Sequence, residues 1–271
     1  MNKSLIYSKV PEVTIFFWII KILCTTVGET AADFLNTNLN LGLTGTTVVL
    51  GVFLLIALFF QFRSSRYVPG IYWLVVVLLS VFGTLITDNL TDNFGVSLVT
   101  TTVVFSIALA AVFIAWYASE KTLSIHSIYT TKREAFYWLA ILFTIALGTA
   151  AGDLVAERFQ LGYLISAILF GVLIAADTIA HKVFRLNPVL AFWIAYILTR
   201  PLGASLGDYF SQSPDDGGLG LGTVGTSVLF LVAILITVTY LAVTKKDAVA
   251  IDTHPNTRTD TPTPTIMEGT D

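Results

Sequence analysis

The chain has little charge and almost no cysteine. Charged residues make up 12% of its 271 residues, and its one cysteine, Cys24, excludes both an internal disulfide and a metal cluster held by several thiolates. It also lacks a phosphate-binding glycine loop, a zinc-protease helix, a nucleophile elbow and a Cys-x-x-Cys pair, so we expect neither an ATP-driven pump nor an enzyme. In their place are 55% hydrophobic residues and a mean hydropathy of +0.80, which indicate an integral membrane protein.

Apolar runs of about 18 or more residues recur along the chain, and each is long enough to cross a bilayer as a helix. Eight such helices are predicted, at residues 13–33, 44–62, 70–90, 96–117, 134–155, 162–182, 188–209 and 222–243. They form one predicted transmembrane domain over residues 1–246. Residues 247–271 are rich in Thr, Pro and Asp, and we expect them to be a disordered cytoplasmic tail.

Basic residues are distributed unevenly among the predicted loops. Twelve of the fifteen Lys and Arg residues lie in the N-terminal segment, in alternate loops and in the tail, whereas the other loops contain only Arg158. Because Lys and Arg are retained on the cytoplasmic side of a membrane, both termini are predicted to be cytoplasmic. We expect a multi-pass protein of the bacterial plasma (inner) membrane, with the lipid bilayer and no nucleic acid as a partner. The sequence does not indicate an oligomeric state.

The chain contains a four-fold internal repeat. The segments that align without gaps are "FWIIKILCTTVGETAAD" (17–33), "YWLVVVLLSVFGTLITD" (72–88), "YWLAILFTIALGTAAGD" (137–153) and "FWIAYILTRPLGASLGD" (192–208). Each has an aromatic residue, Trp, nine residues, Gly, four residues and Asp, and a plainer return helix follows each. The sequence therefore predicts an all-α fold of four parallel two-helix repeats in a pseudo-symmetric bundle, at about residues 11–66, 67–125, 132–185 and 187–246.

The invariant Gly and Trp of the repeats have separate structural interpretations. The glycines remove side chains at equivalent depths, which favours close helix packing in a membrane. The tryptophans, Trp18, Trp73, Trp138 and Trp193, lie near the cytoplasmic ends of their helices. We interpret them as an aromatic belt at the inner membrane interface.

Carboxylates recur at one depth in the predicted bundle. Asp33, Asp88, Asp153 and Asp208 occupy the same repeat position, and Glu29 lies one turn deeper than Asp33 on the same helix face. Acids within transmembrane segments usually face the bundle interior and mark ion pathways. Near the outer boundary of the hydrocarbon, however, an Asp also serves simply to end a helix in contact with water. Both interpretations remain open from the sequence.

Four further ionisable residues, Lys21, Asp177, His181 and Arg200, fall within predicted helices. Unpaired charges at this depth cost several kcal/mol, so partners are expected. Lys21 and Asp177 have similar depths and form the first candidate pair, whereas Arg200 lies near the level of Glu29 and is a candidate to pair with it or with an acid of another repeat. His181 is a candidate ligand or proton carrier one turn from Asp177. A structural ion pair and a relay both remain open.

The predicted intramembrane charges are unbalanced. There are six acids, namely Glu29, Asp177 and the four repeat aspartates, and only two bases, Lys21 and Arg200. If all are ionised, about four negative charges are in excess, which favours cations. With oxygen ligands and no thiolate cluster, the candidate ions are Mn²⁺, Mg²⁺, Ca²⁺ and protons. We expect no tightly bound cofactor, the cation being the substrate.

The four-fold W-x(9)-G-x(4)-D pattern and the opening "KVPEVTIFFWIIKILCTTVGETAADFL" resemble a bacterial family of uncharacterised membrane-anchored, repeat-containing membrane proteins. The resemblance covers residues 9 to 245. It implies a link to metal tolerance, manganese efflux in particular. The metal positions it points to are Glu29, Asp33, Asp88, Asp153 and Asp208. Lys21 and Arg200 depart from the repeat pattern, which argues against a strictly four-fold site.

From these features we expect a transporter of divalent cations, with manganese efflux first and proton exchange as its candidate coupling. Two alternatives remain open. One is a non-transporting membrane scaffold or sensor whose acids are structural, and the other is a transporter of a small organic cation.

The predicted topology is testable with reporter fusions at residues 40, 66, 92, 125, 158, 186, 216 and 250. The reporters should alternate between outside and inside in this order, because the repeats are parallel and the termini cytoplasmic. Activity of a periplasm-dependent and a cytoplasm-dependent reporter at each position measures this. Two adjacent fusions on the same side would contradict the repeat prediction.

Overall fold

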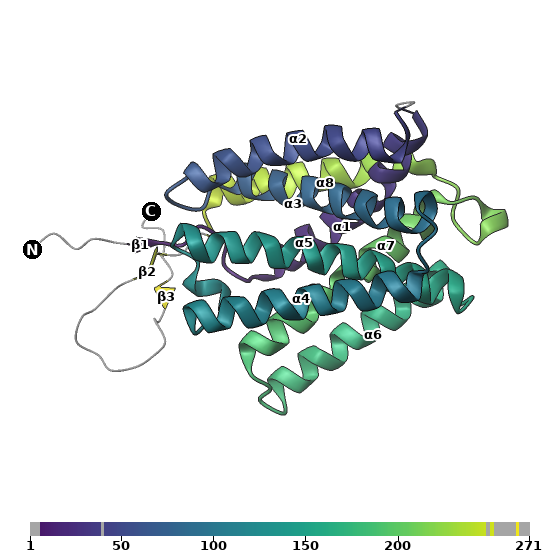
Figure 1. Ribbon diagram of the computed structural model, residues 1–271. Helices are drawn as coiled ribbons and strands as arrows, with labels where there is room; N and C mark the ends of the chain where they lie inside the picture. Colours follow the sequence, from purple (N-terminus) through teal and green to yellow (C-terminus); the bar gives the residue numbers. More distant parts are fainter. Residues whose placement is uncertain (1–5, 39–40, 248–249, 252–263, 266–271) are drawn as a thin grey trace, which may run out of the picture.

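Eight long helices run side by side in the computed structural model, which describes residues 6–38, 41–247, 250–251 and 264–265 (Figure 1). The helices are α1 (Ile15–Asn38), α2 (Gly42–Arg63), α3 (Pro69–Asp88), α4 (Leu98–Glu120), α5 (Thr131–Asp153), α6 (Tyr163–Lys182), α7 (Pro188–Ser211) and α8 (Gly222–Thr244). All eight are long and apolar enough to cross a membrane. The predicted multi-pass helical fold is therefore confirmed.

Short elements connect the long helices or lie before the first and after the last of them. They are the π-helical turns η1 (Asn89–Asn93) and η3 (Leu154–Arg158), the 3₁₀ turns η2 (Ile125–Ser127) and η4 (Pro214–Asp216), and the strands β1 (Ile6–Tyr7), β2 (Ala250–Ile251) and β3 (Pro264–Thr265). The strands pair antiparallel in the order β1-β2-β3, with Ile6 opposite Ile251 and Ala250 opposite Thr265. Most of the predicted disordered tail lies outside the described residues.

Several helix starts follow from local chemistry. Ser97 and Thr130 accept hydrogen bonds from the backbone N–H groups three residues on, at the starts of α4 and α5. Asn187 accepts two such bonds at the start of α7, and Pro188 occupies the first turn. These polar caps satisfy N–H groups that have no partner within the helix, and proline costs nothing there.

The odd-numbered helices form a closed inner ring, in which α1 packs on α3, α3 on α5, α5 on α7, and α7 on α1. The even-numbered helices lie outside, each against the first helix of the following repeat: α2 on α3, α4 on α5, α6 on α7, and α8 on α1. Between 56 and 61% of the apolar span is buried in each odd helix, against 17 to 22% in each even one. The four repeats thus close head to tail around one axis, as a pseudo-symmetric bundle.

The repeat glycines make the ring contacts. In every repeat the glycine lies against the residue three positions before the glycine of the next repeat. A Cβ atom added to any of these glycines would overlap a neighbouring residue. The pairs are Gly28 with Ser80, Gly83 with Ile145, Gly148 with Arg200, and Gly203 with Thr25. The same close approach therefore recurs at all four interfaces of the ring, which is how small residues let membrane helices associate.

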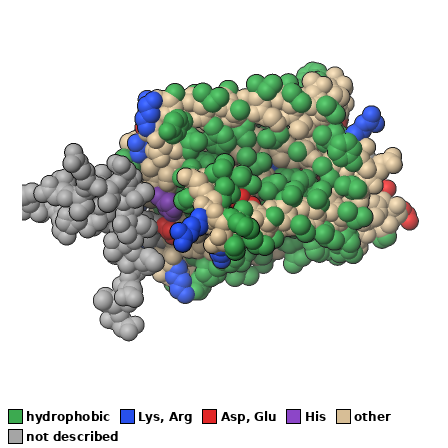
Figure 2. All heavy atoms as spheres, turned by 90° about the horizontal axis from the view of Figure 1, so that it is seen from below, with side chains coloured by type: hydrophobic (Ala, Val, Ile, Leu, Met, Phe, Trp, Pro, Cys, Tyr) green, Lys and Arg blue, Asp and Glu red, His purple; other side chains and the backbone are tan. Residues whose placement is uncertain are grey.

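The outer surface is apolar between two polar ends. Figure 2 shows hydrophobic side chains over the side of the bundle, with most of the visible Lys and Arg side chains gathered at one end. Large apolar residues of the even helices are more than half exposed, among them Phe53, Ile107, Ile168 and Val228. A lipid environment accounts for such a surface.

Polar contacts close the end of the bundle where α1 begins and α8 ends, called the terminal end below. Lys9 forms a buried ion pair with Glu134 at 2.7 Å, and Gln61 Nε2 donates to the other Glu134 oxygen. Tyr67 donates to Asp247 at 2.6 Å, and burial raises the pKa of both groups. Asp247, which the sequence assigned to the tail, is therefore fixed to the bundle.

The expected aromatic belt is wrong for three of the four repeat tryptophans. Trp73, Trp138 and Trp193 are 2 to 4% exposed and pack within the bundle core, while Trp18 is half-buried. Trp73 donates to Tyr67 Oη and Trp193 to the Leu123 carbonyl. The inner ring turns these positions inward, and depth alone does not specify which way a helix faces.

The ring contacts predict different effects for two glycine-to-alanine changes. Gly83→Ala should lower the melting temperature of the purified protein, because its Cβ would lie 2.5 Å from Ile145 Cγ2 and overpacking costs about 1–3 kcal/mol. Gly171→Ala on α6 is the matched control, since nothing lies within 4 Å of its Cβ position. Both variants gain helix propensity, so equal melting temperatures would contradict the ring packing.

Candidate functional site

Side chains at successive steps of four residues along the inner helices form five layers, and contacts across the ring place members of layers 1 to 4 inside it. From the terminal end they are layer 1 (Phe17, Tyr72, Tyr137, Phe192), layer 2 (Lys21, Val76, Ile141, Tyr196), layer 3 (Thr25, Ser80, Ile145, Arg200), layer 4 (Glu29, Thr84, Thr149, Ala204) and layer 5 (Asp33, Asp88, Asp153, Asp208). Every residue of layers 1 to 4 is buried, and the layer-5 aspartates are half-buried. The axis therefore changes from aromatic to acidic along its length.

Arg200 joins the four repeats at the centre of the bundle. Its Nη2 donates to Glu29 Oε2 at 2.6 Å, to Thr149 Oγ1 at 2.7 Å and to Thr84 Oγ1, and its Nη1 donates to the Thr25 carbonyl at 3.3 Å. The Arg200 side chain is 0% exposed and the Glu29 side chain 9%. As their predicted depths suggested, these two residues form an ion pair, and it lies on the axis.

The repeat explains how one arginine reaches three partners. Glu29, Thr84 and Thr149 are the first three members of layer 4, each directly after its repeat glycine. The fourth member, Ala204, has no polar group, and the Arg200 guanidinium reaches this layer from one turn away on the same helix. Thr84 and Thr149 were not predicted as site residues, although the position after the repeat glycine would have identified them.

The acids of layer 5 lie beyond the ion pair, at the end opposite the terminal end. Asp33 and Glu29 are close enough to Asp88 to act on it electrostatically, as is Asp92 in η1. Acids of the first two repeats therefore gather on one side of the axis. Asp153 and Asp208 occupy the equivalent, half-buried positions of the other two repeats and also interact with neighbouring groups.

The predicted metal positions are not assembled into one centre. In the part of the chain that the structure describes, no group of three or more His, Cys, Asp or Glu side chains is placed to hold a metal ion. The Glu29 carboxylate is paired with Arg200, and each of the four repeat aspartates lies on a different helix of the ring. In this conformation the described acids therefore do not enclose a metal site.

The predicted ion pair between Lys21 and Asp177 is wrong. Lys21 Nζ lies 4.4 Å from the centre of the Tyr196 ring and has no hydrogen-bond partner in the part of the chain that the structure describes. Asp177 lies on α6, an outer helix that packs on α7 rather than on α1. The exposed His181 follows one turn later, with Nδ1 2.9 Å from the Leu186 carbonyl. Similar depth was not sufficient evidence for pairing, because the two helices belong to different rings.

Aromatic side chains close the axis at the terminal end. The hydroxyls of Tyr72 and Tyr137 are hydrogen-bonded across layer 1 at 2.5 Å. The rings of Phe17 and Phe192 are tilted by 44° with centroids 6.0 Å apart, and both also contact Tyr196 of layer 2. Among the described residues, the two layer-1 hydroxyls are thus bonded to each other, and aromatic rings make up the rest of the layer.

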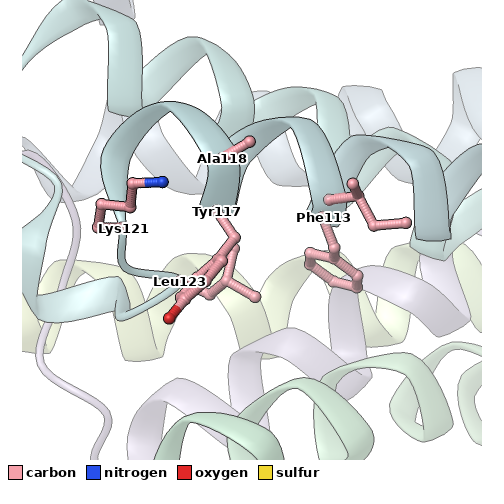
Figure 3. A pocket seen from close by; sticks show the side chains of 6 residues that line it. Phe113, Tyr117, Ala118, Lys121 and Leu123 are labelled. Atoms are coloured by element: carbon pink, nitrogen blue, oxygen red, sulfur yellow. The ribbon is translucent and has the colours of Figure 1, made fainter.

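An open groove on α4 lies away from the axis (Figure 3). It has a volume of about 520 Å³ and is lined by Phe113, Ile114, Tyr117, Ala118, Lys121 and Leu123. Its lining is mostly apolar and comes from the outer helix α4 and the residues that directly follow it. It contains none of the predicted site residues.

Comparison with known proteins identifies the repeat. The sequence profile of a family described as "Repeat of Unknown Function (DUF347)" matches residues 16–67, 71–122, 136–186 and 191–247. Each match covers one inner helix and its return helix. Comparison with curated proteins and with solved structures gives no match.

A double-mutant cycle tests the axial ion pair. Glu29→Met or Arg200→Met alone should destabilise the protein by about 3–5 kcal/mol, because either change leaves a buried charge unpaired. The double variant should lose much less than the sum of the two. Unfolding of the purified protein in mixed micelles measures this, with Asp215→Asn in the exposed η4 turn as a neutral control. Additive losses would show that the two charges are not coupled.

Proposed function

We propose that this chain, which belongs to the DUF347 repeat family, moves divalent cations across the membrane along the axis of its four repeats. The observation that carries the proposal is the buried pair of Glu29 and Arg200 on that axis, with carboxylates directly beyond it. A buried ion pair is a poor way to stabilise a bundle, because an apolar pair of equal volume is often as stable. Its position on the axis therefore favours a functional role.

Arg200 acts in this proposal as a tethered counter-ion. With no substrate bound, the guanidinium neutralises Glu29. A cation that enters past Asp33 and Asp88 competes with the guanidinium for the Glu29 carboxylate. When displaced, Arg200 keeps hydrogen-bond acceptors in Thr84, Thr149 and the Thr25 carbonyl. The exchange thus avoids leaving a bare charge in the core, which would cost several kcal/mol.

The ligand chemistry sets the class of substrate. Carboxylate and hydroxyl oxygens suit Mn²⁺, Mg²⁺ and Ca²⁺, and the axis provides no thiolate or imidazole for softer ions. Manganese is the first candidate, with export as the direction to test and proton exchange at Glu29 as the candidate coupling. The closed layer 1 requires a second conformation in which the terminal end opens, as expected of a transporter rather than a channel.

Flux in proteoliposomes tests the proposal. The wild-type protein should transport Mn²⁺, measured against Mg²⁺, Ca²⁺, Zn²⁺ and an organic cation with an internal fluorescent indicator or isotope. Glu29→Gln combined with Asp33→Asn should reduce the flux by more than about tenfold, since both changes remove a carboxylate charge from the route. Asp88→Asn should mainly raise the cation concentration needed for half-maximal flux.

Asp215→Asn is the matched control, because Asp215 is an exposed acid near the same end of the bundle but off the axis. It should leave the flux unchanged. Absence of cation flux in the wild-type protein, or normal flux in the Glu29 and Asp33 double variant, would instead assign the acids a structural role, as in a scaffold or sensor.

A further inference from the structure

The axis holds a second group of polar side chains, which the cation route does not use. In layers 2 and 3, Lys21 Nζ, Tyr196 Oη, Ser80 Oγ and Arg200 Nε are buried without a hydrogen bond of ordinary geometry in the described part of the chain, and the Tyr196 hydroxyl lies close enough to that of Tyr137 to interact with it. All four residues are at most 1% exposed. Buried polar groups normally have a partner in the protein, in ordered water or in a ligand. Four such groups in adjacent layers are therefore candidates for one shared partner.

These groups have one chemical property in common, since each can donate a hydrogen bond. The Lys ammonium and the Arg N–H groups only donate, and the Tyr and Ser hydroxyls donate or accept. A metal cation needs acceptors, so this group cannot hold one. A small hydrogen-bond acceptor fits it.

The charges in layers 2 and 3 also favour an acceptor that is negatively charged. Lys21 and Arg200 are close enough to act on each other electrostatically. Arg200 is neutralised by Glu29, but no carboxylate among the described residues pairs with Lys21. The Tyr196 ring 4.4 Å away contributes about 0.5–2 kcal/mol, less than the usual cost of burying an ammonium group. A bound negative charge would stabilise the charged form of Lys21.

We propose that Lys21, Tyr196, Ser80 and the Nε of Arg200 form a binding site for a small monovalent anion of chloride size, on the terminal side of the Glu29–Arg200 pair. The site does not depend on the proposed cation transport. It places an anion on the side of Arg200 opposite Glu29, so that Arg200 is attracted in both directions along the axis.

Chloride-dependent stability of the purified full-length protein tests the site. At constant ionic strength, replacing gluconate by chloride should raise the melting temperature of the wild-type protein by about 2–4 °C and saturate, as expected for one bound ligand. Bromide should substitute for chloride, and its anomalous scattering in a crystal should place the ion between Lys21 and Tyr196.

Three variants separate a bound anion from a general salt effect. Lys21→Met should abolish the chloride-dependent shift while remaining at least as stable as wild type in gluconate, because it removes an unpaired buried charge. Tyr196→Phe keeps the aromatic ring, removes the hydroxyl and should weaken chloride binding about tenfold. Lys121→Met changes an exposed lysine and should leave the wild-type shift intact.

Two results would overturn the proposal. Equal melting temperatures of the wild-type protein in chloride and gluconate would mean that water is the partner of these donors. An undiminished shift in both Lys21→Met and Tyr196→Phe would mean that chloride acts elsewhere on the protein. Neither result bears on cation flux, so the two proposals fail separately.

Discussion

The bundle depends on one contact that occurs four times. Each repeat glycine lies against the residue three positions before the glycine of the next repeat, and the fourth contact returns to the first helix. In a membrane, burial of apolar surface does not drive helices together, so close packing must do so. Because the contact is heterologous and closes after four steps, it fixes the number of inner helices and the existence of an axis. The five layers follow from it.

Symmetry of the backbone allows asymmetry of the side chains. In layer 4 the repeats contribute Glu29, Thr84, Thr149 and Ala204, so three polar groups face a gap on the fourth side. Arg200 fills that gap from the layer below and donates to all three. A strictly four-fold ring would hold four equal side chains and no counter-charge. Departure from the repeat is therefore what creates an ion pair at the centre.

The sequence predicts the depth of a residue in the membrane better than the direction in which its side chain faces. The rise per residue is constant in a helix, so residue numbers predict depth. They gave the eight spans, the shared level of the repeat aspartates, and the similar levels of Glu29 and Arg200. The partner of Lys21 could not be predicted in this way, since pairing depends on which helices are neighbours. Nothing in the sequence states that α6 packs on the following repeat rather than facing α1. The buried tryptophans were misplaced for the same reason, because rotation about a helix axis depends on the ring as a whole.

The order of the layers constrains how the axis could open. Aromatic contacts close it at the terminal end, whereas half-buried acids lie at the other end. Each return helix is packed on the next repeat, which prevents one repeat from moving by itself. The opening that the proposed transport requires would then separate larger units, along the interfaces where each repeat glycine meets the next helix. Arg200 spans these interfaces through Glu29, Thr84 and Thr149, so any such movement must break or exchange its hydrogen bonds.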